Sequence, residues 1–248
     1  MSRRSLLATG GAIAFLVFLV ALVPATVLTR WLPPDVAASG LDGTIWSGRA
    51  SSLSLQGRPL GAVNWSCRPW PLLMLEWSCR VDLQPPGGTV SALLSGDFRG
   101  EEIEARDLAG QLPITHFEGI VTPRGWTGIL NLDVTKARIA GGLPQDAEGK
   151  IVVRGLKAPG PNGALLGDFE LTIGEGAVGT ETLTGRLADL GGPLHVRGTI
   201  ELKRDRSYFA SGEVSPGPGA GPEIFDTLGF LGPPDLAGRR PFTVEGTL

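Results

Sequence analysis

The sequence of 248 residues contains few of the side chains on which catalysis depends. It has two histidines, His116 and His195, and neither has a nucleophile or an orienting carboxylate near it in a recognisable pattern. Metal-ligand spacings and nucleophile elbows are also missing, and Gly174-Glu175-Gly176 lacks the strand-to-helix context of a nucleotide site. We therefore predict a protein that is not an enzyme, with no catalytic residues, no metal and no cofactor.

Runs of basic residues are missing as well. Arg3 and Arg4 are two of the 22 basic residues, so residues 30–248 contain 20 basic and 25 acidic side chains, a net charge of −5. This balance argues against binding to nucleic acid. It also argues against a polybasic contact with anionic lipid head groups.

One long stretch has no charge at all. The residues from Ser5 to Thr29 are mostly apolar, and arginines flank the stretch on both sides. A helix needs about 20 apolar residues to cross a bilayer, and basic residues before it favour a cytoplasmic N-terminus. We therefore predict a single-pass protein of the bacterial inner membrane, with residues 1–5 in the cytoplasm, a span at 6–28, a linker at 29–39 and a periplasmic β domain at 40–248.

A cleaved signal peptide is the alternative to an anchor. Val23-Pro24-Ala25 offers small residues at a suitable spacing for cleavage after Ala25. The apolar core of a signal peptide is about 7–15 residues long, and this stretch is longer. The length favours an anchor, but cleavage after Ala25 stays open at this point.

Beyond the apolar stretch, apolar and polar residues alternate in short runs, which is typical of half-buried strands. Pairs and triplets of glycine and proline separate the runs and predict tight turns. The clearest runs lie at 52–56, 130–135, 151–154, 168–173, 194–203 and 242–245. The sequence therefore predicts a meandering antiparallel sheet, and only Pro222–Phe230 has helical spacing.

Such a sheet has one apolar face that has to be covered. A closed barrel, a sandwich or a curled open sheet would each cover it, and the pattern does not choose among them. We expect a mainly β protein in which an N-terminal transmembrane helix precedes an elongated, curled antiparallel sheet, whose apolar face could form a trough.

The two cysteines lie in a repeated tetrapeptide. Trp65-Ser66-Cys67-Arg68 returns twelve residues later as Trp77-Ser78-Cys79-Arg80. If two strands turn around Leu73, Cys67 falls opposite Cys79, at a separation suited to a disulfide. An oxidising compartment favours that bond over two buried thiols, and we predict a Cys67–Cys79 disulfide.

The predicted tip of this hairpin, Pro69–Leu75, is unusually apolar for an exposed turn. It either folds over one end of the core or contacts the membrane surface or another protein. The sequence leaves both interpretations open.

Two segments carry a resemblance to a known family. The first contains Gly40, Gly43, Thr44, Trp46, Gly48 and Ala50, and the second contains Trp65, Pro69, Trp70, Leu72 and Leu73. This order resembles the type II secretion system protein N family, also called general secretion pathway protein N. We treat these eleven residues as candidates for interaction with partners.

The resemblance implies an inner-membrane accessory subunit of the machine that exports folded proteins from the periplasm through the outer membrane. It implies partners among the other secretion subunits, on the inner-membrane platform and on the secretin side, and no enzymatic activity. The terminal run Pro241–Leu248 is a candidate to accept a partner strand at a sheet edge.

A lipid-binding trough is the alternative function. The strand pattern is also similar to that of the AsmA-like bridge proteins, whose curled sheets offer an apolar trough. Acyl chains would then contact inward-facing side chains such as Leu132, Phe169, Leu171, Val196 and Ile200. The same residues would form an ordinary core if no lipid is bound.

Overall fold

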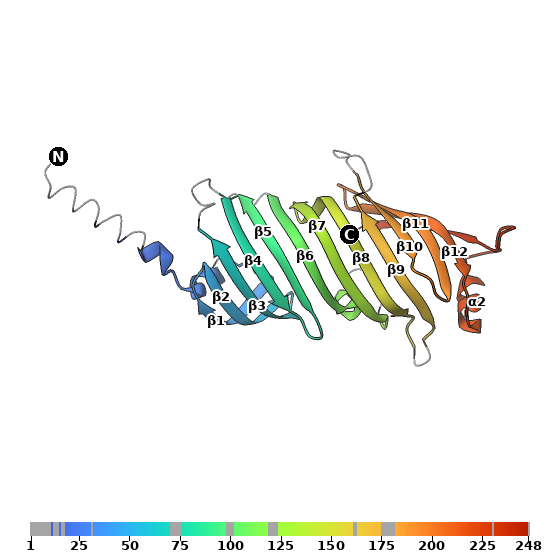
Figure 1. The fold of residues 1–248 in the computed structure, drawn as a ribbon, viewed down its shortest axis with the longest axis horizontal. Coiled ribbons are helices and arrows are strands. Elements are labelled where there is room, and N and C mark those ends of the chain that lie inside the picture. The colour runs from blue at the N-terminus through green and yellow to red at the C-terminus, as the bar shows by residue number, and fades with distance from the viewer. Residues whose placement is uncertain are drawn as a thin grey trace. The chain divides into compact units, whose positions relative to one another are not determined.

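The computed structural model shows thirteen strands that follow one another in chain order (Figure 1). It describes residues 11, 15, 18–30, 32–69, 76–97, 102–118, 124–160, 163–174, 182–229 and 231–247. The strands are β1 Val36–Gly43, β2 Ser47–Leu55, β3 Arg58–Arg68, β4 Glu76–Gln84, β5 Thr89–Asp97, β6 Glu102–Pro113, β7 Thr127–Ala140, β8 Leu143–Lys157, β9 Leu165–Ile173, β10 Thr182–Asp189, β11 Leu194–Lys203, β12 Ser207–Pro216 and β13 Arg240–Thr247. They form one open antiparallel sheet.

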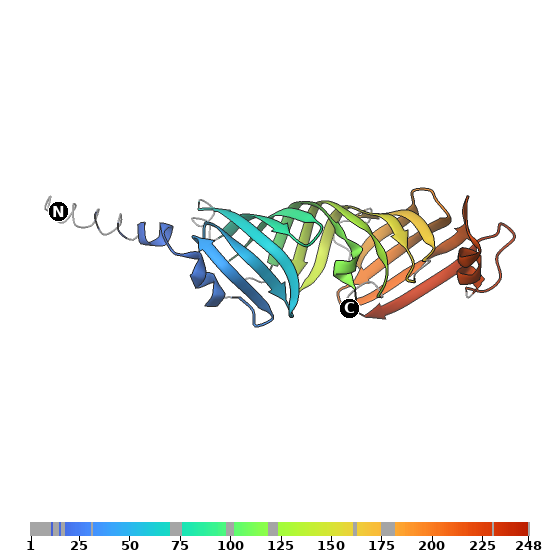
Figure 2. The same ribbon diagram turned by 90° about the horizontal axis from the view of Figure 1, so that it is seen from below.

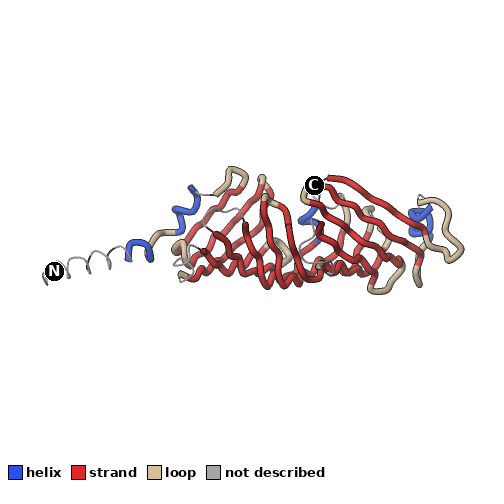
Figure 3. The backbone as a smooth tube through the Cα atoms, turned by 90° about the horizontal axis from the view of Figure 1, so that it is seen from above, coloured by secondary structure: helices blue, strands red, loops and turns tan. Residues whose placement is uncertain are grey.

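The mainly β prediction is confirmed, and the predicted runs lie within strands, except that Gln56 at the end of the run 52–56 lies in the turn after β2. The sheet is open, so the barrel and the sandwich are excluded. Helical segments are few in the described residues (Figure 3): residues 11, 15 and 18–21 are helical, η1 (Ala25–Arg30) and η3 (Ile114–Phe117) are short helical turns, and α2 spans Pro222–Gly229, where the sequence predicts a helix. The curl and the trough stay predictions.

Contacts within the chain group it into two compact units. The first comprises residues 1–86 and contains η1 and β1–β4. The second comprises residues 87–248 and contains β5–β13, η3 and α2. The domain bounds expected from the sequence stay a prediction.

One buried hydrophobic cluster of the second unit lies where α2 packs on the sheet. Ile224 and Leu228, one helical turn apart, are each 3% exposed and pack with Phe169, Val196 and Val214. Val196 and Val214 are direct partners in the β11–β12 register, so alternation along these strands places both side chains on one face. Burial of each aliphatic side chain stabilises the fold by roughly 1.5–3 kcal/mol.

The opposite face of these strands is polar. Lys150 on β8 and Glu170 on β9 form an exposed ion pair of 3.4 Å between Nζ and Oε1, a contact worth at most about 1 kcal/mol. Side chains along these strands therefore alternate between a solvated face and a covered face, as the sequence predicts.

Residues 6–10, 12–14, 16 and 17 of the predicted membrane span lie outside the described residues, as do residues 1–5 before it. In the described part of the chain, no helix has both the length and the apolar character needed to cross a membrane. The anchor therefore stays a prediction.

Candidate interaction site

The turn between β1 and β2 is built around a threonine hydroxyl. Thr44 Oγ1 accepts hydrogen bonds from the backbone N–H groups of Trp46 (3.3 Å) and Ser47 (3.2 Å). The backbone N–H of Thr44 in turn donates to the carbonyl of Ser47 over 2.9 Å. Gly43 precedes this turn with a φ of +91°, a left-handed conformation that glycine adopts without steric cost.

This turn binds residues 20–25, which belong to the C-terminal part of the apolar stretch. The Ile45 N–H donates to the carbonyl of Val23 (3.0 Å), and the indole Nε1–H of Trp46 donates to the carbonyl of Val20 (2.9 Å). Pro24 and Thr44 form an isolated antiparallel bridge. We call residues 43–48 together with residues 20–25 the clasp.

Trp65 on β3 closes the clasp from the sheet. Its indole Nε1–H lies 3.1 Å from the carbonyl oxygen of Thr44 and 3.2 Å from that of Ile45. Gly48 is the register partner of Trp65, and a Cβ at Gly48 would lie 2.6 Å from Trp65 Cζ2 and 2.6 Å from the carbonyl oxygen of Asp42. A side chain at this position would displace Trp65 or the turn.

Two small residues complete the packing. Ala25 is 1% exposed and Ala50 is 2% exposed. Gly40 has a φ of +63°, and a Cβ there would lie 2.5 Å from Ser51 Oγ. The residues with small or absent side chains in this region therefore stand where neighbouring chain segments approach one another closely.

The disulfide is confirmed. Cys67 on β3 bonds Cys79 on β4, and the two are direct partners in the register, as are Trp65 and Val81. The Cys67 N–H also donates to the carbonyl of Trp46 over 2.6 Å. The bond therefore joins β3, whose Trp65 contacts the clasp, to β4. A disulfide that closes a loop of this size contributes roughly 2–4 kcal/mol.

Seven of the eleven predicted interaction residues gather around the clasp and the strands that support it. They are Gly40, Gly43, Thr44, Trp46, Gly48, Ala50 and Trp65. Pro69 follows β3 and is exposed, while Trp70, Leu72 and Leu73 lie outside the described residues. Sequence reasoning missed the other half of the clasp, because Val20 and Val23 take part through backbone carbonyls, which any residue carries.

His195 has a partner that the sequence analysis did not assign. Its Nδ1 lies 2.8 Å from Asp189 Oδ1. Asp189 also accepts hydrogen bonds from the N–H groups of Gly191 (3.1 Å) and Val196 (3.2 Å), so it closes the turn between β10 and β11. Burial alone would raise the pKa of the Asp189 carboxyl, but the hydrogen bonds from His195, Gly191 and Val196 outweigh burial and lower that pKa.

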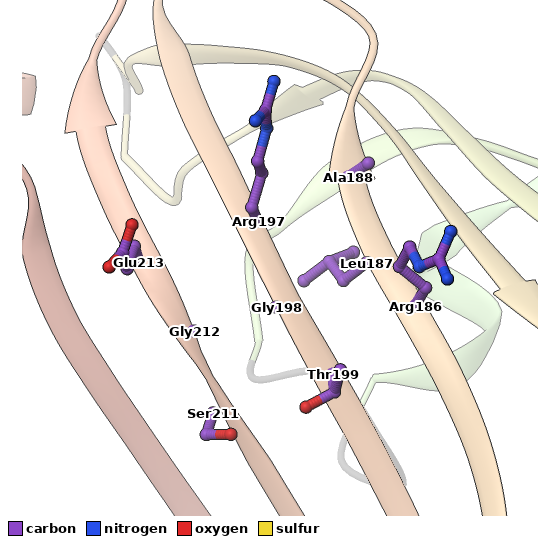
Figure 4. Close-up of a pocket in the computed structure, with 9 residues that line it drawn as sticks. All are labelled: Arg186, Leu187, Ala188, Arg197, Gly198, Thr199, Ser211, Gly212 and Glu213. Atoms are coloured by element: carbon purple, nitrogen blue, oxygen red, sulfur yellow. The ribbon is translucent and has the colours of Figure 1, made fainter.

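A shallow pocket lies on β10–β12 (Figure 4). It is lined by Arg186, Leu187, Ala188, Arg197, Gly198, Thr199, Ser211, Gly212 and Glu213. The guanidinium groups of Arg186 and Arg197 extend away from each other, and Glu213 is engaged by Arg239 at 2.8 Å. Within the described residues, no three His, Cys, Asp or Glu side chains are placed to hold a metal. The pocket thus presents no converging set of charges for a ligand.

Comparison with known proteins covers almost the whole chain. The family described as "Type II secretion system (T2SS), protein N" matches residues 34–243. The chain is 28% identical to the type II secretion system protein N of Aeromonas hydrophila over 260 aligned positions, which cover 100% of both chains. It is also 28% identical to the protein of that name from Vibrio cholerae serotype O1, over 88% of this chain and 87% of the relative. No solved structure matches the chain.

Proposed function

The chain belongs to the type II secretion system protein N family, and we propose that it is a non-catalytic accessory subunit held at the bacterial inner membrane. In this role it supports the export of folded proteins from the periplasm through the outer membrane. Family membership supports a place in the secretion system. The clasp is the observation that supports the mode of attachment.

The clasp uses residues upstream of the candidate cleavage site. Trp46 and Ile45 bind the carbonyls of Val20 and Val23, and both carbonyls would be lost if the chain were cut after Ala25. The cut would remove both hydrogen bonds, each of which contributes roughly 0.5–1.5 kcal/mol to stability. The folded sheet thus favours retention of the apolar stretch as an anchor.

The other features agree with a periplasmic sheet. A structural disulfide persists in oxidising compartments and is rare in the cytoplasm, and Cys67–Cys79 joins two strands of the first unit. In our proposal the N-terminus is cytoplasmic and the sheet meets other subunits of the system in the periplasm. We propose that the clasp holds the start of the sheet close to the membrane surface.

The test is made on the full chain with a C-terminal epitope in its own host. We expect intact mass spectrometry to give the uncleaved mass, and alkaline carbonate to leave the protein in the membrane fraction. We expect deletion to reduce export of folded substrates and the wild-type chain to restore it. A mass corresponding to cleavage after Ala25, or release by carbonate, would overturn the anchor. Undiminished export after deletion would overturn the accessory role.

A second candidate function, lipid binding, rests on apolar side chains that are only half-buried. Leu132, Leu171 and Ile200 are of this kind, whereas Phe169 and Val196 are buried in the core cluster to which α2 contributes. Lipid extracted from the chain after purification in a lipid-free detergent would support this function if Ile200→Asn reduced the amount. Absence of bound lipid from the wild-type chain would contradict it.

A further inference from the structure

The last strand of the sheet has a regular backbone and one neighbour. β13 pairs with β12 through eight consecutive residue pairs, from Ser207↔Thr247 to Val214↔Arg240, without a shift in register. It is last in the strand order, and Figure 2 shows it as the final red strand of the second unit. A strand at a sheet edge presents a row of backbone N–H and C=O groups to its surroundings.

The edge at the other end of the strand order is less regular. The pairing of β1 with β2 is interrupted at Gly40, which has a φ of +63°. Pro24 also forms a bridge at Thr44, directly after β1. Irregular backbone and covering segments are two ways in which proteins prevent pairing at an edge. β13 has a regular backbone, and no segment among the described residues pairs with its other side; Pro241 near its start is its one residue without a backbone N–H.

The side chains of β13 leave its open edge accessible to another chain. Phe242 leans toward the sheet, because a Cβ at Gly212 would lie 2.9 Å from its Cε1 and a Cβ at Gly198 would lie 3.3 Å from its Cζ. Val244, two residues on and on the same face, is 50% exposed. The side chain of Glu245, on the other face, is exposed and makes no hydrogen bond or ion pair within the described part of the chain.

A second copy of this chain does not complement that edge. Antiparallel pairing of two β13 strands about a two-fold axis places residues of the same face opposite each other. The residues that could face Glu245 are then Pro241, Thr243, Glu245 and Thr247, and none of them is basic. The β1 edge of another copy has Asp42 as its single charged residue. Neither edge of a copy places a cation opposite Glu245.

We propose that the β13 edge binds an extended segment of a different protein, which adds a fourteenth strand to the sheet. Main-chain hydrogen bonds supply the affinity, and alternating side chains supply the selection. The segment has apolar residues on the face of Val244 and a lysine or arginine opposite Glu245. The choice of the first proteins to be tested rests on the proposed function. The presence of an open edge does not, because it follows from the pairing of β12 with β13 alone.

The probes are overlapping synthetic peptides that cover the periplasmic segments of the other secretion subunits of the same host. They are titrated against the full-length chain in detergent. We expect binding of peptides with apolar residues at alternate positions and a basic residue between them. N-methylation of alternate backbone nitrogens on the pairing side should lower the affinity at least about tenfold, because several hydrogen bonds are lost together.

Two variants test the position of binding. Val244→Lys places a charge on the edge and should weaken peptide binding, while Phe225→Lys, at a side chain that is 51% exposed on α2, should not. Glu245→Lys should prefer the peptide in which the basic residue is replaced by glutamate. Binding that is insensitive to N-methylation and to Val244→Lys would overturn the proposal, as would binding of none of the peptides. So would a wild-type chain that dimerises through β13. The proposed function is tested separately, by asking whether the wild-type chain restores export after deletion.

Discussion

Gly48→Ala is the sharpest test of the clasp. The substitution adds one methyl group, and the backbone of Gly48 does not have a positive φ, so conformational strain contributes little. The added Cβ would lie 2.6 Å from the carbonyl oxygen of Asp42, 2.6 Å from Trp65 Cζ2 and 3.0 Å from the carbonyl oxygen of Thr44. Two of these three atoms belong to the backbone, which cannot move away as a flexible side chain can.

Overpacking of this kind typically costs about 1–3 kcal/mol. Each kcal/mol lowers Tm by roughly 4–8 °C in a unit of the size of residues 1–86. We expect a lower Tm in thermal unfolding of the full chain, together with faster amide exchange at Ile45, whose N–H is bonded to Val23. The added methyl group should displace Trp65 or the turn. Trp65 and the turn together position the Ile45 N–H for its hydrogen bond to Val23, so this bond should weaken.

Gly229→Ala is the matched control, because a Cβ there has no atom within 4 Å. It should leave Tm unchanged or raise it slightly, since alanine is the better helix former. If Gly48→Ala melts like the wild-type chain and the exchange at Ile45 is unchanged, Trp65 does not lie over Gly48, and our account of the clasp is refuted.

Three further predictions concern the rest of the fold. Leu228→Ala, in the core beneath α2, should lower the free energy of unfolding by about 2–5 kcal/mol, whereas Phe225→Ala on the exposed side of α2 should change it by less than about 0.5 kcal/mol in urea titrations. Because the folded-state pKa of Asp189 is lowered, its contribution to stability is present above an unfolded pKa of about 3.9 and is lost as pH falls through the lower folded value. Unfolding of Asp189→Asn followed between neutral and acid pH should lack that part of the acid dependence, and an unaltered profile would contradict the assignment. Cys67→Ser with Cys79→Ser should lower stability by roughly 2–4 kcal/mol, and reductant should then have no further effect on Tm.

The strands could be predicted because their pattern is local. Leu130, Leu132 and Val134 alternate with polar residues, and β7 carries them in this alternation. Glycine pairs mark the turns, as Gly141-Gly142 does between β7 and β8. The disulfide was predictable for a similar reason, since the spacing of Cys67 and Cys79 defines the register of one hairpin.

The contacts between distant segments could not be predicted in the same way. The clasp joins Trp46 to a carbonyl 26 residues earlier, and no residue type distinguishes one carbonyl from another. The bond between Asp189 and His195 spans a turn, where the direction of each side chain depends on backbone geometry. The open sheet was one of three arrangements that satisfy the same alternation.

The clasp also changes how the predicted interaction residues are interpreted. Gly43, Thr44, Gly48 and Trp65 each have a local reason for their identity: a positive φ, a hydroxyl that closes the turn, a close approach, and an indole that bonds two carbonyls. Residues that are fully engaged within the first unit have little left to offer a partner. Recognition of other subunits is therefore better sought where backbone groups and a charged side chain lie free, and the β13 edge with Glu245 meets that requirement.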